Sequence, residues 1–181
     1  VGSERLGVFP YIMAQMAPAY NHKVYKQKQA LFSNLRTFAG PSGQLTFLSE
    51  NRHLQLERSV VASGEDLHQI PDGSMDVVVS TLVLCSVSSV RKVLAEVLRV
   101  LRRGGAFYFL EHVAADHSSW TYFWQKVFDP LWKCFGDGCS LSRETQKELE
   151  KTNFSELNLK QIYVTPYWIP SSPHIIGYAV K

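Results

Sequence analysis

The sequence predicts an α/β domain whose sheet is mostly parallel and ends in an antiparallel pair of strands. Residues 75–84 form a continuous, largely β-branched run, and residues 106–111 form a second apolar run after an amphipathic segment. A strand buried on both faces of a parallel sheet has this composition, and strand, helix, strand in succession is typical of a βαβ unit. Residues 157–165 and 174–180 are two further strand-like runs, and the Pro-rich connection between them is short enough for an antiparallel pair.

Length and composition indicate a folded domain and exclude several classes of protein. The chain has 181 residues, for which we expect an N-terminal segment over residues 1–20 and a single domain over residues 21–181. The formal net charge is +3 and the basic residues are scattered, which argues against nucleic-acid binding. No apolar run approaches the roughly 20 residues that a membrane-spanning helix needs.

The three cysteines, Cys85, Cys134 and Cys139, are too few for a disulfide framework and indicate a reducing compartment. The spacing of Cys134 and Cys139 differs from that of zinc ligands, and no pair of histidines lies near them in sequence. We therefore expect no metal site. Cys85 lies within an apolar run, where a small buried cysteine is more often inert packing than a nucleophile.

The helices are predicted from apolar residues at helical spacing. A first helix over residues 21–38 carries one apolar stripe and ends at the Gly-Pro-Ser-Gly sequence of residues 40–43. Residues 88–101 form a second helix, which ends at the Arg-Arg-Gly-Gly sequence that follows. Ser142 is expected to cap a charged helix that runs to about Lys151.

A further helix, over residues 120–135, is rich in aromatic residues at helical spacing. Such a set most often belongs to a hydrophobic core, and we expect a core position for it here. An apolar acceptor pocket or contact with a membrane surface is the alternative. The residues are Trp120, Tyr122, Phe123, Trp124, Phe128 and Trp132.

Several stretches resemble the class I S-adenosylmethionine-dependent methyltransferases. Residues 64–87 are similar to the family's second and third cofactor segments, and residues 93–113 are similar to the helix and strand that follow, with Arg103 where the family has Pro. The stretches DVVVSTLVLCSV, GGAFYFLEHVAA, YFWQKVFDPLWK, DGCSLSRET and PHIIGYAVK resemble one branch, the methyltransferase-like protein 7 family. Members of this branch are membrane-associated enzymes regarded as thiol S-methyltransferases. The resemblance extends over residues 29–181.

The resemblance implies a fold, a cofactor, a substrate and a location. It implies a Rossmann-like sheet, S-adenosylmethionine as the cofactor, and S-methylation of small alkyl thiols. It places such a protein at the endoplasmic reticulum membrane or on lipid droplets, on the cytosolic face. This chain lacks the family's N-terminal hydrophobic anchor, so we expect a soluble monomer that associates with a membrane surface at most.

The cofactor loop is the main departure from the family. After the strand matched by residues 45–48, the family has an acidic-Gly-x-Gly-x-Gly loop, a helix and a second strand that ends in an acidic residue. Here only five residues separate Leu48 from Leu54, whereas a parallel crossover needs about a dozen. We therefore expect a sheet truncated in its first βαβ half. The first strand, residues 45–48, is then displaced, or it pairs antiparallel with residues 54–61, or it belongs to a partial sheet. A further alternative is that residues 47–53 form a turn and a helix.

The resemblance assigns the adenine side of the cofactor site to an acidic loop, Gly64-Glu65-Asp66-Leu67. Glu65 or Asp66 would accept a hydrogen bond from the adenine amino group, and Leu67 would pack beside the ring. This loop follows a predicted strand, and such sheets bind ligands at the carboxyl ends of their strands. The alternative is an acidic loop that caps the next turn.

The ends of the two central strands supply the remaining candidates. Ser80, Thr81 and Leu82 end the first strand, near the place of the cofactor's methionine part by resemblance; a core position is the alternative for Leu82. Glu111 and His112 end the second strand, at the mouth of the expected site. His112 is a weak candidate for the general base that accepts the thiol proton, since an ordinary histidine pKa is about 6.5. The alternative is a hydrogen-bonded histidine at the edge of the sheet.

The sequence thus predicts an S-adenosylmethionine-dependent methyltransferase that acts on small alkyl thiols. The alternative is a truncated, non-catalytic relative that acts as a binding or membrane-surface protein. A nucleotide-dependent oxidoreductase has the same fold class, but it needs the same absent glycine loop.

Overall fold

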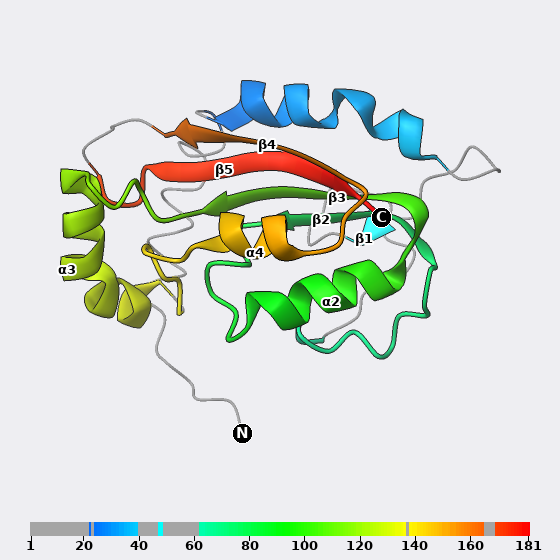
Figure 1. Ribbon diagram of the computed structural model, residues 1–181, viewed down its shortest axis with the longest axis horizontal. Helices are drawn as coiled ribbons and strands as arrows, with labels where there is room; N and C mark the ends of the chain where they lie inside the picture. The colour runs from blue at the N-terminus through cyan, green and yellow to red at the C-terminus, as the bar shows by residue number, and fades with distance from the viewer. Residues whose placement is uncertain (1–21, 23, 40–46, 49–61, 137, 165–168) are drawn as a thin grey trace.

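The structure is a computed structural model, and it confirms the predicted fold class (Figure 1). It describes residues 22, 24–39, 47–48, 62–136, 138–164 and 169–181. Within them, one five-stranded sheet has the strand order β1-β2-β3-β5-β4. β1, β2 and β3 are parallel, whereas β5 is antiparallel to both β3 and β4. The strands are β1 (Phe47–Leu48), β2 (Met75–Thr81), β3 (Leu101–His112), β4 (Glu156–Tyr163) and β5 (Pro173–Val180).

The two central strands, β2 and β3, are buried on both faces, which explains their continuous apolar sequences. Successive residues of a strand point to opposite faces of a sheet. On one face Val77 packs with Tyr108, and on the other Val78 packs with Phe107 and Phe109. The predicted antiparallel pair is also present, with Leu159 of β4 opposite Gly177 of β5.

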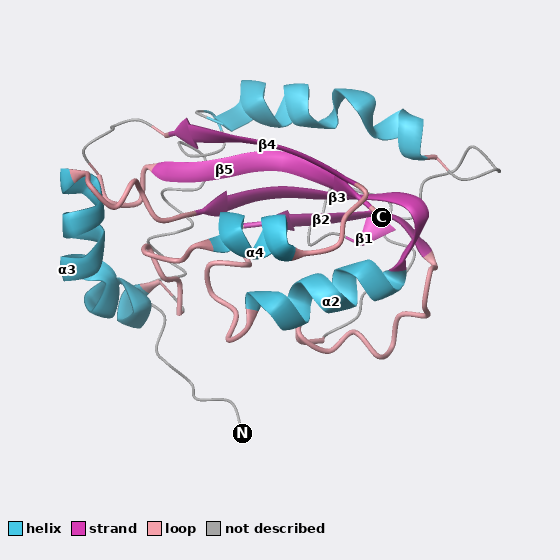
Figure 2. Ribbon diagram, viewed as in Figure 1, coloured by secondary structure: helices cyan, strands magenta, loops and turns pink. Residues whose placement is uncertain are grey.

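Helices cover the two faces of the sheet (Figures 1 and 2). The predicted N-terminal helix is α-helical over residues 24–31 and continues as the 3-10 helix η1 (Phe32–Phe38). Its stripe contacts the Tyr108 face through Leu31, Leu35 and Phe38. The opposite face packs against α2 (Val90–Val100). Ser89 caps α2, because its side chain accepts a hydrogen bond from the Lys92 N–H.

Two predicted boundaries were wrong. β3 begins at Leu101 rather than at residue 106, because residues 102–105 form a bulge: Met75 lies opposite Leu101, but Val77 lies opposite Ala106. The bulge requires Gly104, whose φ is +72°. The last helix, α4 (Thr145–Lys151), begins after Glu144 and not at Ser142, whose backbone N–H donates to the Asp129 carboxylate instead.

The first half of the sheet is short within the described residues. β1 confirms the strand predicted at residues 45–48, and it lies parallel to β2 with Phe47 opposite Val77. The strand predicted over residues 54–61 and the segment before residue 22 lie outside the described residues. Among the helices that the structure does describe, none is both long and apolar enough to cross a membrane.

Candidate active site

The carboxyl ends of β2 and β3 form the edge at which the sequence predicts the methyl-transfer site. β2 ends at Thr81, and Leu82 then adopts a left-handed backbone conformation, with φ at +58°. This conformation is strained for leucine, and strained residues cluster at functional sites. It is held in place by a hydrogen bond of 2.9 Å from the Leu82 N–H to the Leu110 carbonyl of β3. The structure thus brings Thr81 and Leu82 to the predicted edge.

Glu111 fixes the loop that follows β2. Its carboxylate is fully buried and accepts hydrogen bonds from the Ser80 hydroxyl at 2.6 Å and from the Val83 N–H at 3.2 Å. The second oxygen, Oε2, has no hydrogen-bond partner. Burial raises the pKa of Glu111 to about 7, although the hydrogen bond from Ser80 lowers it. The carboxylate therefore joins the ends of the two central strands.

His112 lies in a cluster with two cysteines. Its Nδ1 is 3.4 Å from Cys139 Sγ, and Cys139 Sγ is 3.2 Å from Cys85 Sγ. The hydrogen bond with Cys85, and then that with His112, lowers the pKa of the Cys139 thiol. The hydrogen bond with Cys139, together with burial, raises the pKa of the Cys85 thiol. One nitrogen of the predicted general base therefore faces a thiol of the chain itself.

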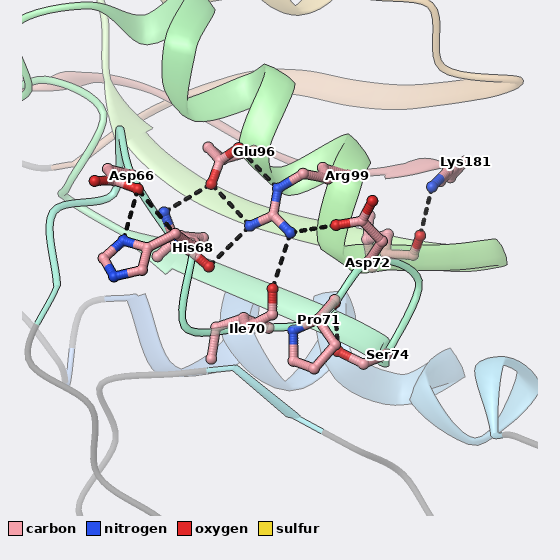
Figure 3. Close-up of polar contacts among 11 residues, drawn as sticks. Asp66, His68, Ile70, Pro71, Asp72, Ser74, Glu96, Arg99 and Lys181 are labelled. Atoms are coloured by element: carbon pink, nitrogen blue, oxygen red, sulfur yellow. Dashed lines mark hydrogen bonds and ion pairs between the residues drawn. The ribbon is translucent and has the colours of Figure 1, made fainter.

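The acidic loop predicted for adenine lies against the first turns of α2. Glu65 Oε1 accepts a hydrogen bond of 2.8 Å from the Ser89 N–H, at the beginning of the helix. Asp66 Oδ1 is 3.0 Å from Nδ1 of His68, which lies in the same loop (Figure 3). The Leu67 N–H donates to Glu96 Oε2 at 2.7 Å. Both carboxylates of the loop thus take part in local hydrogen bonds.

Arg99 of α2 fixes the rest of this loop, and sequence reasoning missed it. Figure 3 shows its guanidinium directed at the loop backbone and at two carboxylates. It donates to the carbonyls of Leu67 and Ile70 at 2.8 and 2.9 Å, and it forms ion pairs with Asp72 and Glu96. The three-residue spacing of Glu96 and Arg99 was a visible signal, but it is equally typical of a solvated helix face. Arg99 and Glu96 thus attach the acidic loop to α2 through hydrogen bonds between their charged side chains and the loop backbone.

The aromatic helix, α3 (Trp120–Phe135), presents an apolar face to solvent, so the expected core position was wrong. Trp120 is 78% exposed and Phe123 is 51% exposed. What α3 packs inward is polar: Gln125 and Asp129 are buried and hydrogen-bond the loops around them. The exposed residues recur every three or four positions and so share one face. They are Trp120, Phe123, Trp124, Val127, Phe128 and Leu131, which we call the α3 apolar face.

An open cleft of about 630 Å³ lies between α2, α3 and α4. Its walls carry both signs of charge, with Arg91 and Lys126 near Glu144 and Glu148. None of the predicted site residues lines this cleft. The structure therefore places the predicted residues in two groups, the acidic loop on α2 and the strand ends.

Comparison with known proteins gives one consistent result. Residues 27–109 match the family model described as "Methyltransferase domain". The human thiol S-methyltransferases TMT1A and TMT1B are 47% and 46% identical to this chain, each over 96% of this chain and 86% of the human protein. Among solved structures, geranyl diphosphate methyltransferase in complex with SAM has a TM-score of 0.52 at 15% identity, over 68% of this chain and 57% of that one.

The alignments with the human proteins are longer than the part of this chain that they cover. Each alignment runs over 209 positions, but 96% of a 181-residue chain is only about 174 residues. About 35 aligned positions of the human proteins therefore have no counterpart in this chain. A loop, a helix and a strand together have about this length.

Proposed function

The chain belongs to the thiol S-methyltransferase family, and we propose that it transfers a methyl group from S-adenosylmethionine to the sulfur of a small alkyl thiol. The observation that carries this proposal is the identity with two human thiol S-methyltransferases along almost the whole chain. The resemblance that the sequence stretches indicated is thereby confirmed. The substrate is proposed from those relatives, and the site residues from the positions described above.

The described residues fit one part of S-adenosylmethionine. Asp66 and Glu65 supply carboxylates for the adenine amino group, beside Gly64 and Leu67, and Arg99 holds their loop in place. Thr81 and the strained turn at residue 82 lie at the strand end, where this fold binds ligands. We assign the adenine contacts to the acidic loop and the methionine contacts to the end of β2.

Methyl transfer needs little from the protein besides the alignment of the reacting atoms. S-adenosylmethionine supplies an electrophilic methyl group on a positively charged sulfonium sulfur. The thiol sulfur must lie in line with that methyl group, and it must lose its proton, because the thiolate is the nucleophile. Glu111 contributes by fixing the ends of β2 and β3 through Ser80 and Val83, so that the two strand ends keep one geometry.

The gap in the alignments supports a second candidate function. We infer that it removes the glycine-rich loop, the helix and the second strand between residues 48 and 54, where the sequence is too short for a crossover. The contacts to the ribose and to the methionine end would then be lost. The second candidate is therefore a non-catalytic relative that binds a partner or a membrane surface without the cofactor.

Calorimetric titration of the folded chain with S-adenosylmethionine separates the two candidates. The enzyme predicts saturable binding with a dissociation constant below about 1 mM, the upper end of ordinary substrate affinities. Asp66→Asn should weaken binding about tenfold, the effect of one hydrogen bond to a charged group. Glu150→Gln is the matched control, because Glu150 is an exposed carboxylate on α4 that bonds only Gln146. A folded chain with no binding heat at millimolar cofactor would leave only the non-catalytic candidate.

We also propose that the α3 apolar face lies on a membrane surface, at the endoplasmic reticulum or on lipid droplets, on the cytosolic side. Contiguous exposed apolar patches on soluble proteins mark interaction sites. Tryptophan and phenylalanine are side chains that insert at the boundary of headgroups and acyl chains, and Lys126 and Lys133 on the same helix suit anionic headgroups. Flotation with anionic vesicles tests this proposal, and a chain that stays with the soluble fraction at low salt contradicts it.

A further inference from the structure

Cys85, His112 and Cys139 form a compact cluster although they are far apart in the sequence. Cys85 lies in the loop after β2, His112 ends β3, and Cys139 follows α3. One potential ligand atom from each lies within 4.8 Å of the other two. Cys85 and Cys139 are 1% and 6% exposed, so the two sulfurs are shielded from bulk water. The expectation of no metal site rested on sequence spacing, which does not reveal this arrangement.

The chemistry of the cluster is that of a soft metal site. Two thiolates and one imidazole are ligands that zinc prefers, with Zn–S distances of about 2.3 Å and Zn–N distances of about 2.0 Å. Tetrahedral coordination at those lengths places two sulfurs about 3.8 Å apart. The sulfurs of Cys85 and Cys139 are 3.2 Å apart, so they need to separate by about half an ångström to admit the ion.

The backbone around the cluster is fixed independently of any ion. The Ser140 N–H donates to the Cys85 carbonyl at 2.9 Å, which joins the loop after α3 to the loop after β2. Asp129 accepts from the Ser140 hydroxyl at 3.0 Å and from the Leu141 N–H at 2.6 Å. Gly138, at φ +83°, makes the turn that directs Cys139 inward. The ligands are therefore held in place before an ion arrives, which favours binding.

We propose that Cys85, Cys139 and His112 bind a thiophilic divalent metal ion of the zinc class. The described residues supply three ligands to this cluster. Three protein ligands leave one position of a tetrahedral ion open to water or another small molecule, a pattern typical of catalytic rather than structural zinc sites. No residue of the acidic loop takes part in this cluster, whereas His112 is also the weak candidate for the general base.

Cobalt(II) titration of the reduced full chain tests the site. We expect a thiolate-to-cobalt charge-transfer band that saturates at one equivalent and disappears when zinc is added. Cys85→Ser and Cys139→Ser should each weaken cobalt binding at least tenfold, and His112→Gln should shift the visible bands. Cys134→Ser is the matched control, because Cys134 is an exposed free cysteine on α3 outside the cluster, and it should leave the spectrum unchanged.

A second measurement uses the unmodified chain, in case the cysteine variants do not fold. Zinc should slow the alkylation of Cys85 and Cys139 by iodoacetamide at least tenfold relative to Cys134, as read by peptide mass spectrometry. The proposal is overturned if the folded chain gives no thiolate-to-cobalt band and zinc protects neither cysteine. It is also overturned if peroxide joins Cys85 to Cys139 in a disulfide while zinc does not bind, because the pair is then a redox pair.

Discussion

Two amphipathic helices of this chain differ in what their apolar faces contact, since one faces the sheet and the other faces solvent. α2 buries its apolar stripe against the sheet, with Leu94 1% exposed and Val97 2% exposed. α3 presents an equally regular stripe to solvent, and Phe123 and Leu131 are each more than half exposed. On the inner side α3 packs the buried polar residues Gln125 and Asp129. The same periodicity therefore marks a core helix in one place and an external surface in the other.

The difference shows what an apolar stripe does and does not reveal. Periodicity indicates that one face of a helix avoids water, but not what covers that face. For α2 the cover is the sheet, and the polar side of the helix is also engaged, through Glu96 and Arg99. For α3 the described residues provide no cover, and we propose that a membrane surface supplies it.

The largest expected effect comes from truncating one leucine in each helix. Leu94→Ala should lower the free energy of unfolding by about 2–5 kcal/mol, because it leaves a cavity in the core. Leu131→Ala removes the same atoms from the α3 apolar face and should change the free energy of unfolding by less than about 0.5 kcal/mol. Urea denaturation measures both. Equal losses would mean that α3 is covered and that the comparison fails.

The polar side of α2 gives the next effect. Arg99→Met keeps an apolar stem but removes the hydrogen bonds to Leu67, Ile70 and Glu96, and should lower the free energy of unfolding by less than Leu94→Ala does. It should also weaken S-adenosylmethionine binding, because the acidic loop is released. Lys126→Met is the counterpart on α3 and should change neither quantity. If folded Arg99→Met binds the cofactor as the unmodified chain does, the acidic loop does not form part of the cofactor site.

A smaller effect is expected at the membrane. Replacing Trp120, Phe123 and Trp124 together with serine should reduce partitioning onto anionic vesicles about tenfold or more, since each side chain buries apolar area in the interface. The thermal midpoint should remain or rise, because these side chains are exposed. A matched variant replaces three polar residues of α4 with serine, the half-buried Gln146 and the exposed Lys147 and Glu150, and should bind vesicles as the unmodified chain does. If the triple variant of α3 partitions onto vesicles as the unmodified chain does, the proposed membrane surface is wrong.

The smallest effect concerns pH and Glu96. The hydrogen bond from Arg99 lowers the pKa of Glu96, against the raising effect of burial. A carboxylate with a lowered folded-state pKa stabilises the fold above its unfolded pKa of about 4.3, and the contribution disappears as the pH falls through the folded value. Stability should therefore fall less steeply between about pH 5 and 3 in Glu96→Gln than in the unmodified chain. Parallel curves from urea denaturation at each pH would contradict this contribution.

Much of the fold was predictable because local sequence and burial agree. The β-branched run of β2, the stripe of α2 and the antiparallel pair β4–β5 all follow from periodicity. The bulge at residues 102–105 was not predictable, since it depends on how β3 pairs with β2. The exposure of α3 was also missed, because the buried Gln125 and Asp129 form hydrogen bonds that only the folded chain brings together.

The candidate site was indicated by a different kind of signal, resemblance to a family rather than periodicity. Resemblance indicated the acidic loop and the strand ends as the candidate site, whereas Arg99 carries no motif. The cluster of Cys85, His112 and Cys139 could not be read from spacing, because its ligands follow three different elements. Contacts between distant segments depend on the fold rather than on local sequence.

The central claim is that this chain methylates the sulfur of small alkyl thiols, although about 35 aligned positions of its human relatives have no counterpart in it. Mass spectrometry of a reaction with deuteromethyl-labelled S-adenosylmethionine and a simple alkyl thiol tests it most directly. The account predicts a thioether that carries the intact labelled methyl group, formed in equal amount with S-adenosylhomocysteine. At a cofactor concentration well below saturation, product formation should be reduced about tenfold in Asp66→Asn but not in Glu150→Gln. A folded chain that yields no labelled thioether at saturating thiol and cofactor would contradict it.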